Sequence, residues 1–149
     1  MNTNTKQKLL LLSDAQEETV WATPVGGNRF SVASIPFMAY NISFGDIVET
    51  ISHESGLPTA SQIVKKAGHR TIRLIVEDSS DFDDEKTKKI VESFKKFGCG
   101  IEGFEPVLIA LDIPPEVDIH MIVDFCKEQK FEWEFGDPQP DKAKYTIIK

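Results

Sequence analysis

The period of the hydrophobic pattern changes near residue 70, and this change limits the possible folds more than any other feature of the sequence. Across residues 8–69, short apolar runs alternate with turns that contain glycine or proline. This spacing is typical of a small curled β-sheet or a partial barrel. The clearest hairpin covers residues 18–35, with Gly26-Gly27-Asn28 as its turn. We therefore predict a β-rich N-terminal part, preceded by a disordered polar tail at residues 1–7.

Helical periods appear in the second half of the chain. Residues 79–98 and residues 114–130 each place apolar side chains on one face of a helix. Extended runs precede, separate and follow these two segments, which is the βαββαβ order of a ferredoxin-like sandwich. The sequence thus predicts an α+β fold, in which a ferredoxin-like part at residues 70–149 packs as one unit with the β-rich part at residues 8–69.

The charge of the chain is negative and unevenly distributed. The net charge is −7, and residues 77–149 alone contribute −8, from ten basic and eighteen acidic residues. Such a balance argues against nucleic acid as the main partner, because phosphate binding depends on lysine and arginine. An RNA-associated regulator would need a basic face, which only residues 65–73 offer. A basic protein surface is the partner that this charge favours.

Membrane, metal and cofactor sites have no sequence support. The four leucines at residues 9–12 are too few for a signal peptide, and no apolar run reaches the length of a membrane span. We therefore expect a cytoplasmic protein with no membrane partner. The two cysteines, Cys99 and Cys126, have no metal-binding spacing, and no H-E-x-x-H pattern occurs. We expect no metal and no cofactor.

The run of residues 65–73, KKAGHRTIR, is the densest group of reactive side chains in the chain. Strand alternation sends His69 to one face of a sheet and Arg70 to the other, so the group is divided. No nucleophile motif such as G-x-S-x-G is present. We therefore assign no catalytic residue and expect no enzyme. The alternative is a small-molecule or nucleotide-handling domain that uses Asp46, His69 and Arg70, with Asp46 orienting the imidazole.

Two groups of carboxylates are candidates for binding a partner. The run EDSSDFDDE lacks the calcium-loop pattern, so it either caps a helix or docks a basic surface. In FEWEFGD, the two glutamates share one face of an alternating strand, which is either a solvated face or a contact surface. The residues predicted to bind the partner are Asp81, Asp83, Asp84, Glu85, Glu132 and Glu134.

Four short motifs resemble those of a bacterial family of small proteins that is described only as a domain of unknown function. They are Glu18 with Trp21-Ala22, Ile35-Pro36-Phe37 with Tyr40, Gly45-Asp46-Ile47-Val48-Glu49, and Ala67-Gly68-His69-Arg70-Thr71. The resemblance covers about residues 8–137. It departs from the family pattern at Ala67, where a serine is usual, and at Arg70, where a small residue is usual. If the family uses that serine in catalysis, this chain lacks it.

The resemblance itself implies no defined activity. Proteins of this size and build include immunity proteins, which bind and neutralise a toxin domain encoded beside them. Toxin nucleases are commonly basic, which suits an acidic inhibitor. The sequence therefore predicts a non-enzymatic binding protein, in its most specific form an immunity protein against a basic toxin domain of the nuclease type.

Overall fold

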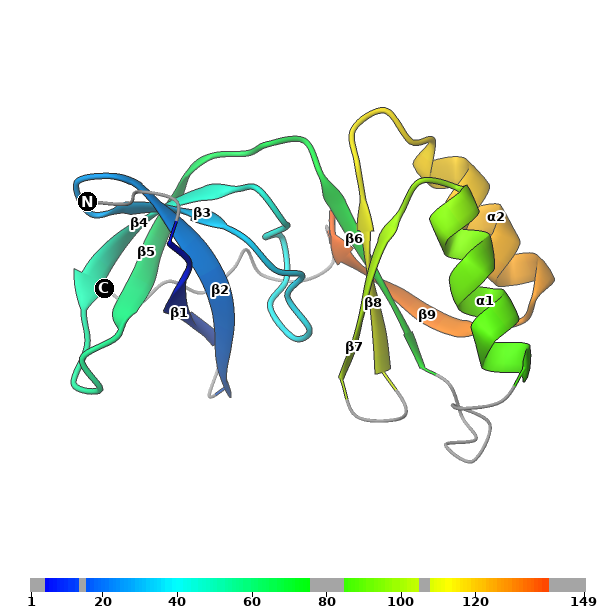
Figure 1. The fold of residues 1–149 in the computed structure, drawn as a ribbon, viewed down its shortest axis with the longest axis horizontal. Coiled ribbons are helices and arrows are strands. Elements are labelled where there is room, and N and C mark those ends of the chain that lie inside the picture. Colours follow the sequence, from blue (N-terminus) through cyan, green and yellow to red (C-terminus); the bar gives the residue numbers. More distant parts are fainter. Residues whose placement is uncertain (1–4, 14–15, 76–84, 105–107, 140–149) are drawn as a thin grey trace.

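A computed structural model describes residues 5–13, 16–75, 85–104 and 108–139. Its first half is a closed barrel of five strands in the order β1-β2-β3-β4-β5 (Figure 1). All neighbours in the barrel are antiparallel except β1 and β5, which close it as a parallel pair. The barrel strands are β1 (Gln7–Ser13), β2 (Gln16–Gly26), β3 (Arg29–Val32), β4 (Ile47–Ser52) and β5 (Pro58–Lys65).

The interior of the barrel is filled by the alternating side chains that the sequence pattern marks. Leu9, Leu11, Val20 and Val48 are among its fully or almost fully buried residues. The β2–β3 hairpin turns at Gly26, whose φ of 119° is strained for any residue with a Cβ. The predicted hairpin at residues 18–35 is therefore confirmed, with β2 and β3 paired as expected.

The second half is a four-stranded antiparallel sheet in the order β7-β8-β6-β9, with two helices on one of its faces (Figure 1). Phe94 of the first helix and Ile122 and Cys126 of the second are fully buried against the sheet. Neither described helix has the length and apolar content that crossing a bilayer requires. The elements are β6 (Arg70–Ile75), α1 (Glu85–Lys96), β7 (Gly100–Phe104), β8 (Leu108–Ile113), α2 (Ile119–Glu128) and β9 (Glu132–Asp137).

The predicted fold class, α+β with a ferredoxin-like second half, is wrong. The described residues are mostly β, with nine strands in two sheets and two short helices. Helix α2 begins at Ile119, later than its sequence period indicates, whereas the predicted start of the first helix at residues 79–84 lies outside the described residues. The N-terminal sheet is also larger than expected, because β1 already begins at Gln7 and its pairing with β5 turns a partial barrel into a closed one.

Candidate functional site

The barrel and the second sheet meet at a seam that we define by the loop at residues 33–46 and by strands β6 and β9. The loop leaves the barrel after β3 and lies against the face of the sheet that the helices leave uncovered (Figure 1). The backbone N–H of Asn41 donates to the carbonyl of Gly136, 2.7 Å away, which ties the loop to β9. The seam is therefore the place where side chains from both halves come together.

One carboxylate from the barrel holds the loop in shape. Glu18 of β2 accepts hydrogen bonds from three consecutive backbone N–H groups, those of Phe37, Met38 and Ala39. Successive N–H groups that converge on one anion form a well-defined concave arrangement. The Glu18 carboxylate occupies this arrangement, so its role is to fix the segment that carries Phe37 and Met38 over the sheet.

One end of the seam is closed by Lys66 together with the carboxylates of Asp46 and Asp137 and the carbonyl of Asn41, a group that we call the lysine cluster. Lys66 follows β5, and its Nζ lies 2.6 Å from Oδ2 of Asp46, 2.6 Å from Oδ2 of Asp137 and 3.1 Å from the carbonyl oxygen of Asn41. Asp46 is fully buried and also accepts from the backbone N–H groups of Ser43 and Ala67, each at 2.9 Å. Each oxygen of the Asp46 carboxylate therefore accepts hydrogen bonds from groups of the protein. Through Lys66, the cluster links the end of β5 to the end of β9.

Arg73 of β6 crosses the seam in the opposite direction, and its side chain is almost completely buried. Its Nη1 donates to the carbonyls of Pro36 and Ala39 in the loop, at 3.2 and 2.9 Å. Its Nε donates to Oε2 of Glu134 on β9 at 3.1 Å. The guanidinium lies against Gly136, where a Cβ would approach the Arg73 Cζ to 3.0 Å. A side chain at position 136 would therefore displace Arg73.

The second terminal nitrogen of Arg73 makes no hydrogen bond with the described residues. This nitrogen, Nη2, is buried. Leaving a buried polar group without a partner costs about 1–3 kcal/mol. The ring of Tyr40 lies beside the guanidinium, with its centroid 4.8 Å from Cζ, and a cation–π contact of this kind offsets part of that cost. Arg73 is thus the one described side chain with a buried nitrogen or oxygen that lacks a hydrogen bond.

Tyr40 connects the loop to the same carboxylate. Its hydroxyl donates to Glu134, with the two carboxylate oxygens at 2.8 and 3.1 Å. Burial, followed by the hydrogen bond to Glu134, raises the pKa of Tyr40 above its ordinary value of 10.0. Tyr40 therefore stays protonated and acts as a donor, while Glu134 is held by Tyr40 and Arg73 together.

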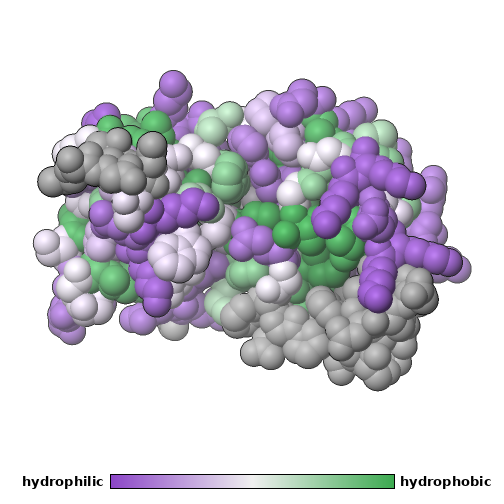
Figure 2. Space-filling view, viewed as in Figure 1, coloured by the Kyte–Doolittle hydropathy of each residue, from purple (hydrophilic) through white to green (hydrophobic). Residues whose placement is uncertain are grey.

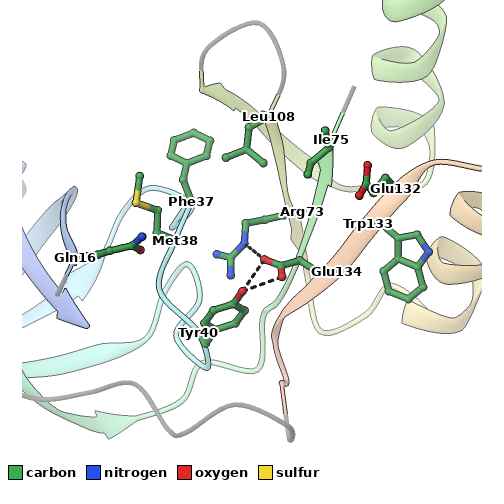
Figure 3. Close-up of a pocket in the computed structure, with 10 residues that line it drawn as sticks. All are labelled: Gln16, Phe37, Met38, Tyr40, Arg73, Ile75, Leu108, Glu132, Trp133 and Glu134. Atoms are coloured by element: carbon green, nitrogen blue, oxygen red, sulfur yellow. Dashed lines mark hydrogen bonds and ion pairs between the residues drawn. The ribbon is translucent and has the colours of Figure 1, made fainter. Parts of the chain in front are cut away.

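A cavity of about 560 Å³ opens above these side chains, between the loop and the sheet (Figure 3). We call it the Arg73 pocket. Hydrophobic surface also gathers near the middle of the molecule, over the second sheet, in Figure 2. The apolar residues of the pocket are Phe37, Met38, Ile75, Leu108 and Trp133. Its polar residues are Gln16, Tyr40, Arg73, Glu132 and Glu134.

The structure gives the residues of the predicted ligand site separate partners. Nδ1 of His69 lies 2.7 Å from Oδ1 of Asp112, so the expected His69–Asp46 pair is not formed. Arg70 donates from Nη2 to the carbonyl of Pro114 at 2.8 Å, and holds the segment before α2. Asp46 belongs to the lysine cluster. All three residues therefore make contacts that fix the chain at or near the seam.

The predicted partner-binding carboxylates fall into two groups. Asp81, Asp83 and Asp84 lie outside the described residues, and Glu85 is the first residue of α1. On β9, Glu134 is engaged by Tyr40 and Arg73, whereas Glu132 is exposed and lines the Arg73 pocket. Glu132 is thus the described acidic residue best placed to meet a partner there.

Metal and thiol chemistry find little support within the described part of the chain. No group of three or more histidine, cysteine or acidic side chains there is arranged to hold a metal ion. Cys99 and Cys126 are both buried, and burial raises their pKa values to about 11 and about 12. Thiols with such pKa values stay protonated at neutral pH, which makes them poor nucleophiles.

Sequence reasoning counted Arg73 only as one of the basic residues at 65–73 and did not identify it as a site residue, and it missed the function of Glu18. A signal for Arg73 was present, because it is the single charged residue inside the apolar run Thr71–Ile75. A charge in such a run is either exposed or paired in a specific way. Glu18 was noticed only as part of a motif, and its partners lie 19 to 21 residues away in the sequence.

Comparison with known proteins places the chain in a family without supplying an activity. No curated protein matches it. Its fold is similar to the crystal structure of a hypothetical protein from Neisseria gonorrhoeae, with a TM-score of 0.70 and 19% sequence identity over 91% of this chain and 96% of that one. Residues 18–135 match the model of the domain of unknown function DUF4265. The chain therefore belongs to the DUF4265 family, as its motifs indicated.

Proposed function

We propose that this protein acts by binding a partner protein, as an immunity-type inhibitor of a basic toxin domain, and that the Arg73 pocket is part of its contact surface. The observation that carries the proposal is the unpartnered Nη2 of Arg73 in a pocket with apolar walls. A few well-placed polar groups within apolar surroundings are typical of a binding site. The rim adds an exposed apolar residue, Ile75, whose side chain is 45% exposed.

The candidate reactive groups support binding over catalysis. His69 is held by Asp112, and Asp46 is held by Lys66, Ser43 and Ala67. These contacts leave the groups to stabilise the seam rather than to face a substrate. A binding protein needs no activated nucleophile, and it makes use of a pocket of this kind without further chemistry.

The charge of the chain supports a basic partner. The net charge is −7, and Glu132 places an exposed carboxylate at the pocket. Opposite charges across an interface speed association and select the correct partner, and the effect weakens as salt is added. Asp81, Asp83 and Asp84 stay predictions for the same surface, and the nuclease type of the toxin stays a prediction as well.

The test uses the purified protein and the purified product of the neighbouring open reading frame. Isothermal titration calorimetry is expected to give a one-to-one complex whose affinity falls with increasing salt, and the partner's toxicity or nuclease activity is expected to be lost in the complex. No complex, or a complex that leaves the partner's activity intact, would contradict the proposed function.

A matched pair of variants locates the contact surface. Ile75→Arg puts a positive charge at the Arg73 pocket, whereas Ile51→Arg puts it on β4 of the barrel, where the isoleucine is similarly exposed (41% against 45%). We expect Ile75→Arg to weaken the complex about tenfold or more, because the contact would bury the new charge against apolar surface without a partner. Ile51→Arg is expected to change the affinity little. Equal effects of the two variants would place the contact elsewhere.

A further inference from the structure

We propose that the Arg73 pocket recognises a neutral carbonyl group beside a bulky apolar side chain, as found in a peptide segment of the partner. The inference rests on the proposed function for the source of that segment. The preference of the pocket itself depends only on its own residues. It follows from three properties of the pocket: its unused donors, its charge and its walls.

The unused donors call for an acceptor. A guanidinium carries five N–H donors. The Nε–H is used by Glu134, and the two donors of Nη1 are used by the carbonyls of Pro36 and Ala39. The two donors of Nη2 have no described partner. An acceptor oxygen placed on Nη2 would remove the cost of leaving them buried and unpaired.

The charge of the pocket favours a neutral acceptor over a carboxylate. The positive charge of Arg73 is already balanced by Glu134, whose Oε2 is 3.1 Å from Nε. Glu132 adds a further negative charge to the pocket lining. A carboxylate ligand would therefore bring a second anion next to Glu134, and like charges in a partly buried site repel strongly. A peptide carbonyl accepts from Nη2 without this repulsion.

The walls favour an apolar group next to that carbonyl. Phe37 and Met38 approach from the loop, and Ile75 and Leu108 approach from the sheet (Figure 3). Nη2 of Arg73 is buried, so a ligand in the pocket can reach it only when a neighbouring side chain moves aside. Met38 is suited to this movement, since an unbranched thioether adopts several rotamers easily.

The test compares three probes of nearly equal shape: phenylacetamide, phenylacetate and 2-phenylethylamine. They carry a neutral acceptor, an anion and a cation without an acceptor, so they separate hydrogen bonding from charge and from apolar contact. Each is titrated into the wild-type protein by NMR, following the methyl signals of Ile75 and Leu108 and the guanidinium signals of Arg73. We expect saturable binding of phenylacetamide, about tenfold or more tighter than that of the other two, with a shift of the Arg73 Nη2 signal.

A pair of variants at exposed positions separates loss of the pocket from loss of the fold. Ile75→Arg changes an exposed residue and is expected to abolish the binding of phenylacetamide, whereas Ile51→Arg is expected to preserve it. Tighter binding of phenylacetate, equal binding of all three probes, or shifts that spare Arg73 would overturn the inference.

The outcome is separable from that of the proposed function. If the partner complex forms and phenylacetamide does not bind, the carbonyl preference is wrong while the function stands. If phenylacetamide binds as described and no partner complex forms, the function is wrong while the preference stands.

Discussion

Lys66 and Arg73 are two cationic side chains that cross the same seam in opposite directions. Lys66 reaches from the barrel to Asp137 of the sheet, and Arg73 reaches from the sheet to the carbonyls of the barrel loop. An ammonium group has three donors, and those of Lys66 meet Asp46, Asp137 and Asn41. Arg73 has five donors, and the two on Nη2 meet no described partner.

This difference separates a contact that stabilises the fold from a site that can bind a ligand. A closed set of donors and acceptors stabilises the seam and has nothing left to offer a ligand. An open set in a buried place lowers stability unless another molecule completes it. Groups of this kind persist where function needs them. The contrast therefore assigns the lysine cluster to the fold and the Arg73 pocket to binding.

The largest expected effect comes from breaking the closed cluster. Asp46→Ala removes a fully buried acceptor from Lys66 and from the backbone N–H groups of Ser43 and Ala67. We expect the free energy of unfolding to fall by about 3 kcal/mol, because the backbone N–H groups of Ser43 and Ala67 lose their acceptor, whereas the exposed Lys66 ammonium can turn to water. Urea denaturation followed by circular dichroism measures this change.

Asp124→Ala is the control for that variant, because Asp124 is an exposed carboxylate on α2. Its effect is expected to stay below about 0.5 kcal/mol, as for most surface substitutions. Equal stabilities of Asp46→Ala and Asp124→Ala would remove the structural role that we give to the lysine cluster.

A smaller effect is expected when the loop over the pocket is released. Glu18→Ala removes the acceptor of three backbone N–H groups in the loop, and we expect a loss of about 2 kcal/mol. Phenylacetamide binding should weaken as well, because Phe37 and Met38 form one wall of the pocket. Glu17→Ala, at an exposed neighbouring position, is the control. Unchanged binding in Glu18→Ala would show that the loop does not shape the pocket.

The smallest expected effect concerns the pH dependence of the His69–Asp112 contact. Burial raises the pKa of Asp112 above its ordinary value of 3.8, although the hydrogen bond to His69 opposes this shift. A raised folded-state pKa means that the folded protein binds the proton more tightly than the unfolded chain does. The stabilisation is therefore complete below 3.8 and is lost as the pH rises through the higher folded-state value.

The comparison that tests this sign is wild type against Asp112→Asn, which does not titrate at this position. Urea denaturation from about pH 3 to about pH 6 covers the ordinary range of an aspartate. The stability of the wild type relative to the variant is expected to fall as the pH rises. A relative gain with rising pH would mean that the hydrogen bond to His69 outweighs burial.

Local patterns in the sequence predicted several elements of the fold. Alternation and the Gly26-Gly27 turn gave the β2–β3 hairpin, and alternation in FEWEFGD gave strand β9. Barrel closure was not predictable in this way, because β1 and β5 pair at Leu10 and Thr59, far apart in the chain. The fold class was misjudged for the same reason, since pairing between distant strands determines how much of the chain is sheet.

The site depends on contacts that are even more distant in sequence. Arg73 and Glu134 are separated by 61 residues, and Tyr40 and Glu134 by 94. The sequence did mark Glu18, Tyr40, Asp46 and His69 as motif residues. Their roles in the loop and the seam became clear only from the fold, because each of them acts on a segment far along the chain.

The most direct measurement of the central claim is the NMR spectrum of the Arg73 guanidinium in the free protein and in the complex with the product of the neighbouring open reading frame. We predict that the Nη2 signals shift on binding, because an acceptor from the partner forms a hydrogen bond with this nitrogen. The Nη1 signals should change little, because Pro36 and Ala39 already hold that nitrogen. A complex that forms while the Nη2 signals stay unchanged would contradict the claim that the Arg73 pocket is the binding site.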